Sequence, residues 1–178
     1  MLTACRGAGE YAARNRAIIL LLLDTGIRSD ELRMLDLSDL DMGSRRLQIR
    51  HGKGRKQRVV PFTDAPAEAI HRYVDDYRGD APGALLRTVS TSNGLGRLNR
   101  YHLGNLMRKL GAEAGVHSNP HRFRHTFATW AIEAGAREID VQYLLGHSTS
   151  VMVRRYSSTY DASKAAINHA AFSPASRL

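Results

Sequence analysis

The sequence predicts an α+β fold that is mainly helical and carries a small antiparallel β-sheet. Apolar residues recur at three- and four-residue spacing along most of the chain, which is the pattern of amphipathic helices. Two short alternating stretches, residues 46–51 and 58–62, flank the turn sequence "GKGRK" and are typical of a β-hairpin. With 178 residues, of which 43% are hydrophobic, the chain is long enough for one compact domain with its own core.

The first half of the chain predicts two helices, a hairpin and a third helix. Residues 11–24 form a helix that ends at Gly26, and residues 29–35 form the next, with Ser29 or Asp30 near its cap. Residues 41–43 are a turn before the hairpin. Another helix begins at Thr63 or Asp64. Its expected inner face consists of Ile70, Tyr73, Val74 and Tyr77.

The second half predicts further short elements. Residues 85–89 suggest a third strand before the loop "STSNGLG", and residues 100–114 a helix. That helix is expected to bury Leu103, Leu106, Met107 and Leu110. Helices are also predicted over residues 139–145, 151–156 and 161–171.

The stretch "NPHRFRHTFATW", residues 119–130, gathers basic side chains at a helix start. Asn119 is a suitable N-cap and Pro120 suits the first turn. His121, Arg124 and His125 have i, i+3 and i+4 spacing and so share one face. The other face is expected to anchor in the core through Phe123, Phe127, Trp130 and Ala131. Such a rigid basic cluster suggests an anionic ligand.

Two other interpretations of this stretch are open from its residues alone. His121 and His125 have the spacing of a zincin helix, but Arg122 stands where the general-base glutamate is needed, and Arg124 adds a second cation. Zinc is therefore disfavoured. The alternative is an ordinary solvated basic face with one histidine satisfied in the core.

Composition favours a polyanionic partner. Lys and Arg number 26 against 17 Asp and Glu, a formal net charge of +9, which suggests nucleic acid before membrane, although a basic surface alone also fits. The single cysteine, Cys5, excludes an internal disulfide and a cysteine-rich zinc module. The longest apolar run, residues 17–23, is too short to span a bilayer. We expect a cytoplasmic protein with no membrane partner.

Several residues have positions that suit phosphate chemistry. Arg28 stands immediately before a helix N-terminus, where anions are favoured, and Glu31 is placed to orient it. "GKGRK" fails as a Walker A loop, but Lys53 at a hairpin tip suits a mobile cation or proton donor. His147 follows a helix end. Tyr156 lies beside two arginines that can activate it as a nucleophile, although most tyrosines at such positions simply pack.

Taken in order, "TGIRSDEL", "GKGRKQRVVP", "PHRFRHTFAT" and "LLGHSTSVMVRRY" resemble the successive motifs of the tyrosine recombinase, or phage integrase, family over residues 14–160. The resemblance implies the catalytic-domain fold of DNA breaking–rejoining enzymes. It also implies a catalytic set that consists of Arg28, Lys53, His121, Arg124, His147 and Tyr156. His125 is expected to have a structural role.

The chemistry implied by the resemblance is metal-independent transesterification. Tyr156 attacks a DNA phosphodiester and forms a 3′-phosphotyrosyl link, and Arg28, Arg124 and His147 stabilise the phosphate. His121 assists proton loss from the tyrosine, and Lys53 protonates the leaving 5′-oxygen. A 5′-hydroxyl of another strand then reverses the attack. No cofactor and no metal ion are required.

The expected partner is double-stranded DNA in a bacterial or phage setting. The full-length protein is expected to form a tetramer on paired DNA sites and to be a monomer without DNA. The remaining basic clusters supply the predicted DNA contacts: Arg45, Arg46, Arg55, Lys56, Arg58, Arg97, Arg100, Arg154 and Arg155.

The domain expectation is one catalytic domain over residues 1–178, with a core of about 11–160 and a tail helix with a frayed end over 161–178. The N-terminal DNA-binding domain usual in the family is expected to be absent, as in an excised domain or a naturally short protein. Strand relaxation of the type IB topoisomerase kind, and a binding-only regulatory descendant, are the alternative functions.

Overall fold

The computed structural model describes residues 1–5, 7–50, 57–88 and 96–146. The helices are α1 (Glu10–Thr25), α2 (Ser29–Met34), α3 (Asp64–Tyr73), α4 (Arg100–Glu113), α5 (Pro120–Glu133) and α6 (Glu138–Leu145). The strands are β1 (Leu40–Asp41), β2 (Arg46–Ile49) and β3 (Arg58–Pro61). Short helical turns cover Thr3–Cys5, Leu37–Asp39 and Val74–Arg78. The prediction of a mainly helical α+β fold is confirmed.

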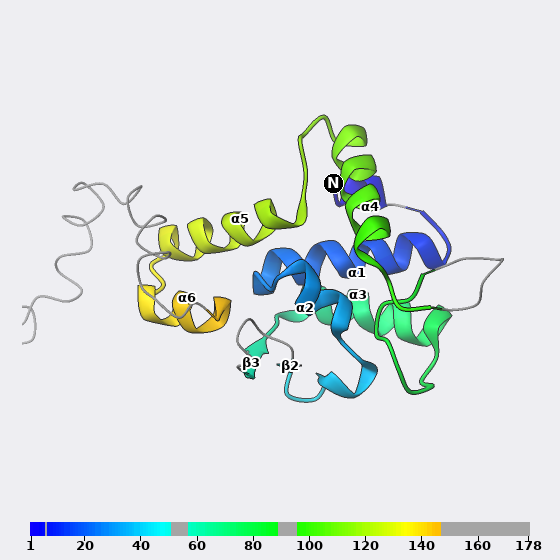
Figure 1. Ribbon diagram of the computed structural model, residues 1–178, viewed down its shortest axis with the longest axis horizontal. Helices are drawn as coiled ribbons and strands as arrows, with labels where there is room; N and C mark the ends of the chain where they lie inside the picture. The colour runs from blue at the N-terminus through cyan, green and yellow to red at the C-terminus, as the bar shows by residue number, and fades with distance from the viewer. Residues whose placement is uncertain (6, 51–56, 89–95, 147–178) are drawn as a thin grey trace, which may run out of the picture.

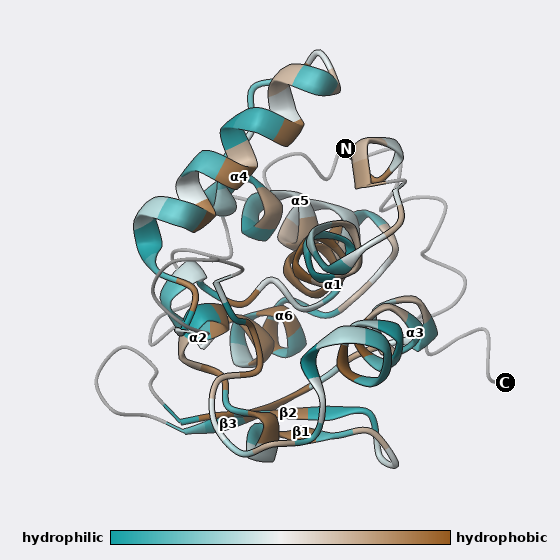
Figure 2. Ribbon diagram, turned by 90° about the vertical axis from the view of Figure 1, so that its right-hand side faces the viewer, coloured by the Kyte–Doolittle hydropathy of each residue, from teal (hydrophilic) through white to brown (hydrophobic). Residues whose placement is uncertain are grey.

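Helix α1 is the centre of the domain. It runs through the middle of the molecule in Figure 1, and Figure 2, which looks along it, shows the other helices and the sheet arranged around it. Its residues from Ala17 to Leu22 are all buried, because the apolar run occupies every face of the helix and not one stripe. Helices α3 and α5 make its most extensive contacts. The predicted buried helix is therefore correct.

The sheet has the strand order β1-β2-β3 and is antiparallel throughout. Leu47 pairs with Val60 and Ile49 with Arg58, and all four of these residues are buried. The strand that joins the predicted hairpin is therefore β1. The prediction of a third strand at residues 85–89 is wrong for the residues described there. Leu85 and Leu86 are both buried, so this stretch runs through the core as a loop and makes only isolated bridges.

Helix α2 begins at Ser29 as predicted, with Arg28 as its N-cap, and the Glu31 carboxylate accepts the Arg28 backbone N–H at 2.8 Å. The end of α3 differs from the prediction. Helix α3 ends at Tyr73 and continues as the wider turn Val74–Arg78, which rotates the following side chains. Tyr77 is 38% exposed for this reason, contrary to its predicted place on the inner face.

Helix α5 begins as predicted, since the Asn119 side chain accepts the backbone N–H of Arg122. Its predicted core face is partly wrong, because Trp130 is 59% exposed while Ala128 and Ile132 are buried. These two pack with Val141 and Leu145 of α6 in a small second cluster, so α5 turns its buried side toward α6. Trp130 instead lines an apolar groove of about 400 Å³ beside α1 and α3.

Within the described part of the chain, no helix has the length and apolarity needed to cross a bilayer. The helices predicted over residues 151–156 and 161–171 lie outside the described residues.

We predict that Gly26→Ala destabilises the fold more than Gly115→Ala. Both glycines have a positive φ, of 61° and 67°, so both substitutions incur the left-handed penalty. Only at Gly26 would the new Cβ meet side chains, at 2.5 Å from Phe127 and 2.7 Å from Leu145. Overpacking of this kind costs about 1–3 kcal/mol. Urea denaturation of both variants measures the difference, and equal free energies of unfolding would contradict the close packing of α5 and α6 on this turn.

Candidate active site

The junction of α1 and α2 presents Arg28. Gly26 adopts a left-handed conformation that ends α1, and its N–H donates to the Leu22 carbonyl. Two residues later the extended backbone of Arg28 starts α2. The Arg28 side chain is 28% exposed and its Nη1 donates to Oε1 of Glu31 at 2.9 Å. The prediction that Glu31 orients Arg28 agrees with this geometry.

Glu31 is the anionic centre of the site. Its side chain is 2% exposed, and it also accepts two bonds from the guanidinium of Arg58, from Nη1 at 2.9 Å and from Nη2 at 2.7 Å. Burial alone would raise the pKa of this carboxyl. The hydrogen bonds from Arg58 and Arg28, with the nearby positive charge of Arg58, outweigh burial and lower the pKa to about 2. Glu31 is therefore ionised at any ordinary pH.

Arg58 differs from its expected role as a surface DNA contact. It is 7% exposed, and besides Glu31 it donates from Nε to the Leu144 carbonyl at 2.8 Å. The reason is its parity in β3, which places Arg58 and Val60 on the inner face of the sheet. Its guanidinium thus joins β3 to α2 and to the end of α6.

Arg124 is 5% exposed and links the end of α1 to the end of α6. Its Nη1 donates to the Gly26 carbonyl at 2.8 Å and its Nη2 to the Leu145 carbonyl at 2.6 Å. His121 and His125 are exposed on the same helix. The three residues therefore do not share one solvent-facing side as expected: the arginine points inward and the histidines lie at the surface, with His125 Nδ1 3.4 Å from the Thr129 hydroxyl.

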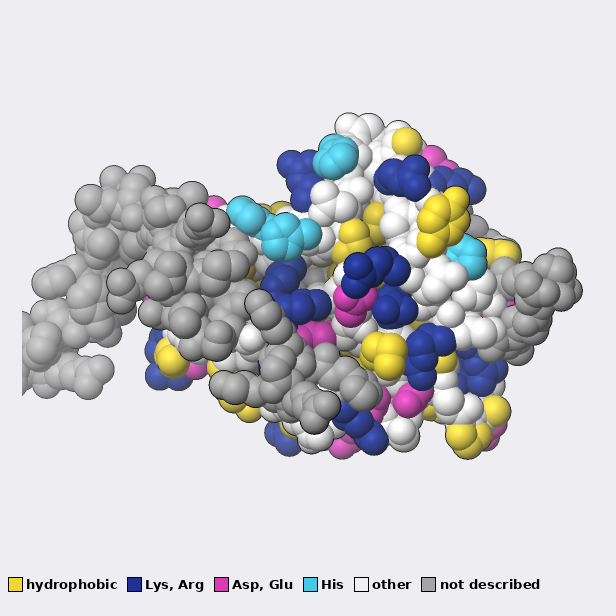
Figure 3. All heavy atoms as spheres, in the orientation of Figure 1, with side chains coloured by type: hydrophobic (Ala, Val, Ile, Leu, Met, Phe, Trp, Pro, Cys, Tyr) yellow, Lys and Arg dark blue, Asp and Glu magenta, His cyan; other side chains and the backbone are white. Residues whose placement is uncertain are grey.

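Three arginines converge on successive carbonyls at the C-terminus of α6. Arg58 donates to Leu144, Arg124 to Leu145 and Arg28 to Gly146, the last at 3.3 Å. The carbonyls at a helix C-terminus have no partner within the helix and carry partial negative charge, so they attract cations. This end of α6 brings Arg28 and Arg124 together, although they are 96 positions apart in the sequence. Figure 3 shows basic side chains and histidines gathered on the face over α2, α4 and α5.

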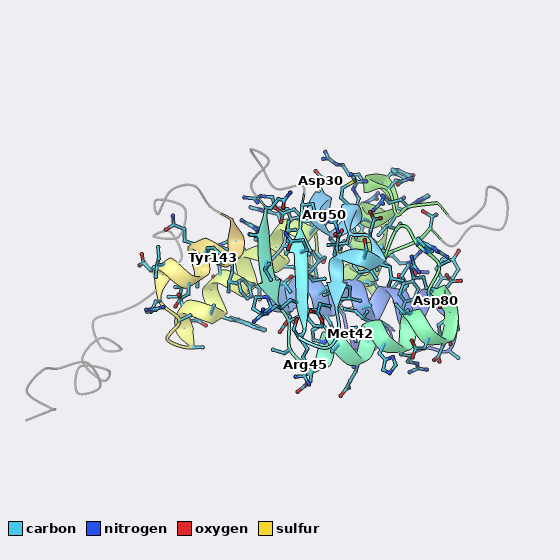
Figure 4. All side chains as sticks on the ribbon, turned by 90° about the horizontal axis from the view of Figure 1, so that it is seen from below. Asp30, Met42, Arg45, Arg50, Asp80 and Tyr143 are labelled. Atoms are coloured by element: carbon cyan, nitrogen blue, oxygen red, sulfur yellow. The ribbon has the colours of Figure 1, made fainter. Side chains whose placement is uncertain are left out.

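The remaining predicted DNA contacts are spread over several surfaces. Arg45 and Arg46 are exposed at one end of β2, and Arg45 pairs with Asp64. Figure 4 shows Arg45 at the opposite end of this strand from Arg50. Arg100 is exposed and pairs with Asp30. Arg97 is half-buried. It donates to the backbone carbonyls of Arg33 and Leu35 and to the Asp36 carboxylate, and these contacts stabilise the fold.

The other predicted site residues lie outside the described residues. They are Lys53, Arg55, Lys56, His147, Arg154, Arg155 and Tyr156. Among the described residues there is no cluster of three or more His, Cys, Asp or Glu side chains suited to a metal ion.

Sequence reasoning missed the internal role of Arg58 and the close contact that it makes with Gly146. An ideal Cβ on Gly146 would lie 3.0–3.2 Å from three atoms of the Arg58 guanidinium. The sequence does carry a signal for this role, because Arg58 alternates with Val60 and Phe62, and all three are buried. A charged residue on the same strand face as inward-pointing apolar residues needs a buried partner.

Comparison with known proteins places this arrangement in context. The family model described as the phage integrase family matches residues 1–163. The chain is 32% identical over 166 residues to tyrosine recombinase XerC of Syntrophus aciditrophicus, covering 85% of this chain and 53% of that protein. The chain thus spans about half the length of the curated relatives that it matches.

Two solved structures are similar in fold. The crystal structure of XerA recombinase is 26% identical with a TM-score of 0.74, covering 97% of this chain and 61% of that one. The XerH site-specific recombinase bound to its difH substrate is 24% identical with a TM-score of 0.71, covering 97% of this chain and 51% of that one. The predicted fold of a tyrosine recombinase catalytic domain is confirmed.

We predict that Glu31→Gln removes an acid-sensitive part of the stability. Because the folded pKa of Glu31 is about 2 and its ordinary value is 4.5, its contribution is fully present above pH 4.5 and is lost as the pH falls toward 2. The shift corresponds to about 3 kcal/mol at neutral pH. Denaturant unfolding at several pH values should give a flatter profile for the variant.

The control for this experiment is Asp140→Asn. Asp140 pairs with Arg137 at the surface, where solvent screening leaves such ion pairs with little effect on stability. A loss for Glu31→Gln as small as that of the control would show that the buried carboxylate contributes no special stability.

Proposed function

Because the chain belongs to the phage integrase family, we propose that it is the catalytic domain of a tyrosine-type site-specific DNA recombinase. It cleaves and rejoins DNA strands through a 3′-phosphotyrosyl intermediate. The observation that carries the proposal is the meeting of Arg28 and Arg124 on adjacent carbonyls at the end of α6, directly before His147. Two guanidiniums held side by side match the non-bridging oxygens of one phosphate.

The proposed reaction is a pair of transesterifications. The Tyr156 hydroxyl oxygen attacks the scissile phosphorus, the bond to the 5′-oxygen breaks, and the 3′-phosphate stays on the tyrosine. In the second step a 5′-hydroxyl from another strand attacks this phosphotyrosine and releases Tyr156. One phosphate ester bond forms for each that breaks, so the proposed reaction needs neither nucleotide hydrolysis nor a cofactor.

Arg28 and Arg124 stabilise the additional charge on the phosphate as the transition state forms. Both are fixed by contacts within the protein, Arg28 by Glu31 and Arg124 by the carbonyls of Gly26 and Leu145. Donors fixed in advance need little reorganisation during the reaction, which is the main source of such electrostatic catalysis. This rigidity supports a catalytic role over simple charge attraction.

The proton transfers are assigned to the remaining residues of the set. His121 lies at the surface in the first turn of α5, one turn before Arg124, and assists proton loss from Tyr156. His147 follows the α6 C-cap Gly146 and donates a hydrogen bond to the phosphate. Lys53 protonates the leaving 5′-oxygen.

Double-stranded DNA is the proposed substrate and partner. The +9 formal charge and the basic face over α2, α4 and α5 complement a phosphate backbone, and the similarly folded XerH site-specific recombinase is bound to its difH substrate. We also propose that the full-length protein acts as a tetramer on paired DNA sites. It would be encoded by a bacterium or a phage and act in the bacterial cytoplasm.

We predict that Tyr156→Phe abolishes covalent protein–DNA adducts on a nicked suicide duplex that carries the recombination site. The phenylalanine variant lacks the attacking oxygen. Tyr160→Phe, four residues away, is the matched control and should retain adduct formation. Denaturing gel electrophoresis measures the adduct, and an adduct with the Tyr156 variant would refute the assigned nucleophile and with it this mechanism.

A further prediction concerns the cations of the site. Arg28→Ala and Arg124→Ala should each lower the cleavage rate by about 10²–10³-fold, the usual cost of a lost preorganised donor, while chelator leaves wild-type cleavage intact. Arg137→Ala, which removes an exposed arginine of a surface pair, is the control and should cleave normally. Single-turnover rates measure the effect. An absolute requirement for a divalent metal would contradict the proposed chemistry.

A further inference from the structure

We propose that Arg58 is a positioning residue for both catalytic arginines, a role that rests on the proposed function. It does not touch the phosphate. It fixes the Glu31 carboxylate that holds Arg28 and the end of α6 that binds Arg28 and Arg124. The side chain therefore acts through its contacts with two elements, α2 and the end of α6.

The first contact is the planar pair with Glu31. Two nitrogens of Arg58 bind the two carboxylate oxygens at 2.9 and 2.7 Å, which fixes the plane of the carboxylate. Oε1 also accepts from Arg28 Nη1 at 2.9 Å. A rotation of the carboxylate away from Arg58 would thus move the acceptor that orients Arg28.

The second contact is with the end of α6. Arg58 Nε donates to the Leu144 carbonyl at 2.8 Å, and the two carbonyls that follow accept from Arg124 and Arg28. Gly146 permits this approach, since it has a φ of 62° and any side chain there would meet the Arg58 guanidinium. Holding the first carbonyl of the series therefore sets the position of the next two.

Orientation, and not added positive charge, is the contribution of Arg58. Its side chain is 6% exposed and lies against an ionised carboxylate, so the two charges largely cancel at the phosphate. A lysine would keep the charge, but its single ammonium group cannot make the planar pair and the Leu144 contact together. This difference separates positioning from electrostatics.

The test compares Arg58→Lys and Arg58→Met with Arg78→Lys and Arg78→Met. Arg78 is a matched control because it is 4% exposed and also spends its donors inside the protein, on the carbonyls of Gly79, Ala81, Gly83 and Ala84. It lies near Asp80, at the end of the molecule opposite the Tyr143 side of α6 in Figure 4. Single-turnover cleavage and DNA affinity are measured separately on the full-length protein.

For both Arg58 variants we expect the cleavage rate at saturating DNA to fall by about 10²-fold, the scale of a small misplacement of catalytic groups. The DNA dissociation constant should change by less than about threefold, because Arg58 contacts no DNA in this proposal. Both Arg78 variants should cleave at the wild-type rate. A wild-type cleavage rate for Arg58→Lys would overturn the proposal, because this variant keeps the positive charge but loses the planar pair with Glu31.

A second readout does not depend on DNA cleavage. In Arg58→Lys, the guanidinium NMR signals of Arg28 should become those of a mobile side chain, whereas in Arg78→Lys they should match those of the wild type. In Arg58→Met, the pKa of Glu31 should rise from about 2. If the wild-type protein forms no adduct, the proposed function fails while this measurement still decides the positioning role. Unchanged Arg28 signals in a folded variant would refute it.

Gly146→Ala provides a test if the Arg58 variants do not fold. It displaces the Arg58 guanidinium without removing it, and Gly135→Ala is the control, since Gly135 also has a positive φ of 90° but has no atom within 4 Å of an added Cβ. We expect slower cleavage only for Gly146→Ala. Equal rates for the two glycine variants would contradict the proposal.

Discussion

The buried carboxylate of Glu31 holds together the elements that form the site. Arg28, Arg58 and Arg124 all lie near the end of α6, and three guanidiniums this close would repel one another in a low-dielectric interior. Glu31 supplies a full negative charge to two of them, Arg28 and Arg58, and the carbonyls of α6 supply partial charges. Burying an ion is unfavourable unless it is paired and its hydrogen bonds are satisfied. Here each group satisfies another, so the cluster is stable only as a whole.

This dependence explains why the backbone around the site is so closely packed. Gly26 ends α1 where Phe127 of α5 and Leu145 of α6 leave no space for a side chain, and its carbonyl accepts from Arg124. Gly146 ends α6 against the Arg58 guanidinium. Both glycines have a positive φ, so the same residues that reverse the chain also allow the arginines to approach the backbone. The ends of α1 and α6 and the site therefore depend on the same close packing.

The sequence predicts the parts of this arrangement that depend on local patterns. The spacing of apolar residues locates α1, α4 and α5, and the position of Arg28 before a helix with Glu31 three residues later is a local signal that the structure matches. The role of Arg58 is not local, since its partners Glu31 and Leu144 lie 27 and 86 positions away. Trp130 was misplaced for a related reason: spacing identifies a buried stripe, but the partner helix α6 decides which stripe is buried.

The network also determines which contact a DNA phosphate would replace under the proposed function. Of the three bonds to the end of α6, that from Arg28 to Gly146 is the longest, at 3.3 Å against 2.8 and 2.6 Å, and Arg28 is the most exposed of the three arginines. A charge-assisted bond to phosphate is stronger than a bond to a neutral carbonyl. Exchange at Arg28 therefore favours binding, while the shorter bonds of Arg58 and Arg124 keep the end of α6 in place. Arg28 binds Glu31 through Nη1 and Gly146 through Nη2, so this exchange would change one acceptor of the guanidinium and leave the other, which orients it.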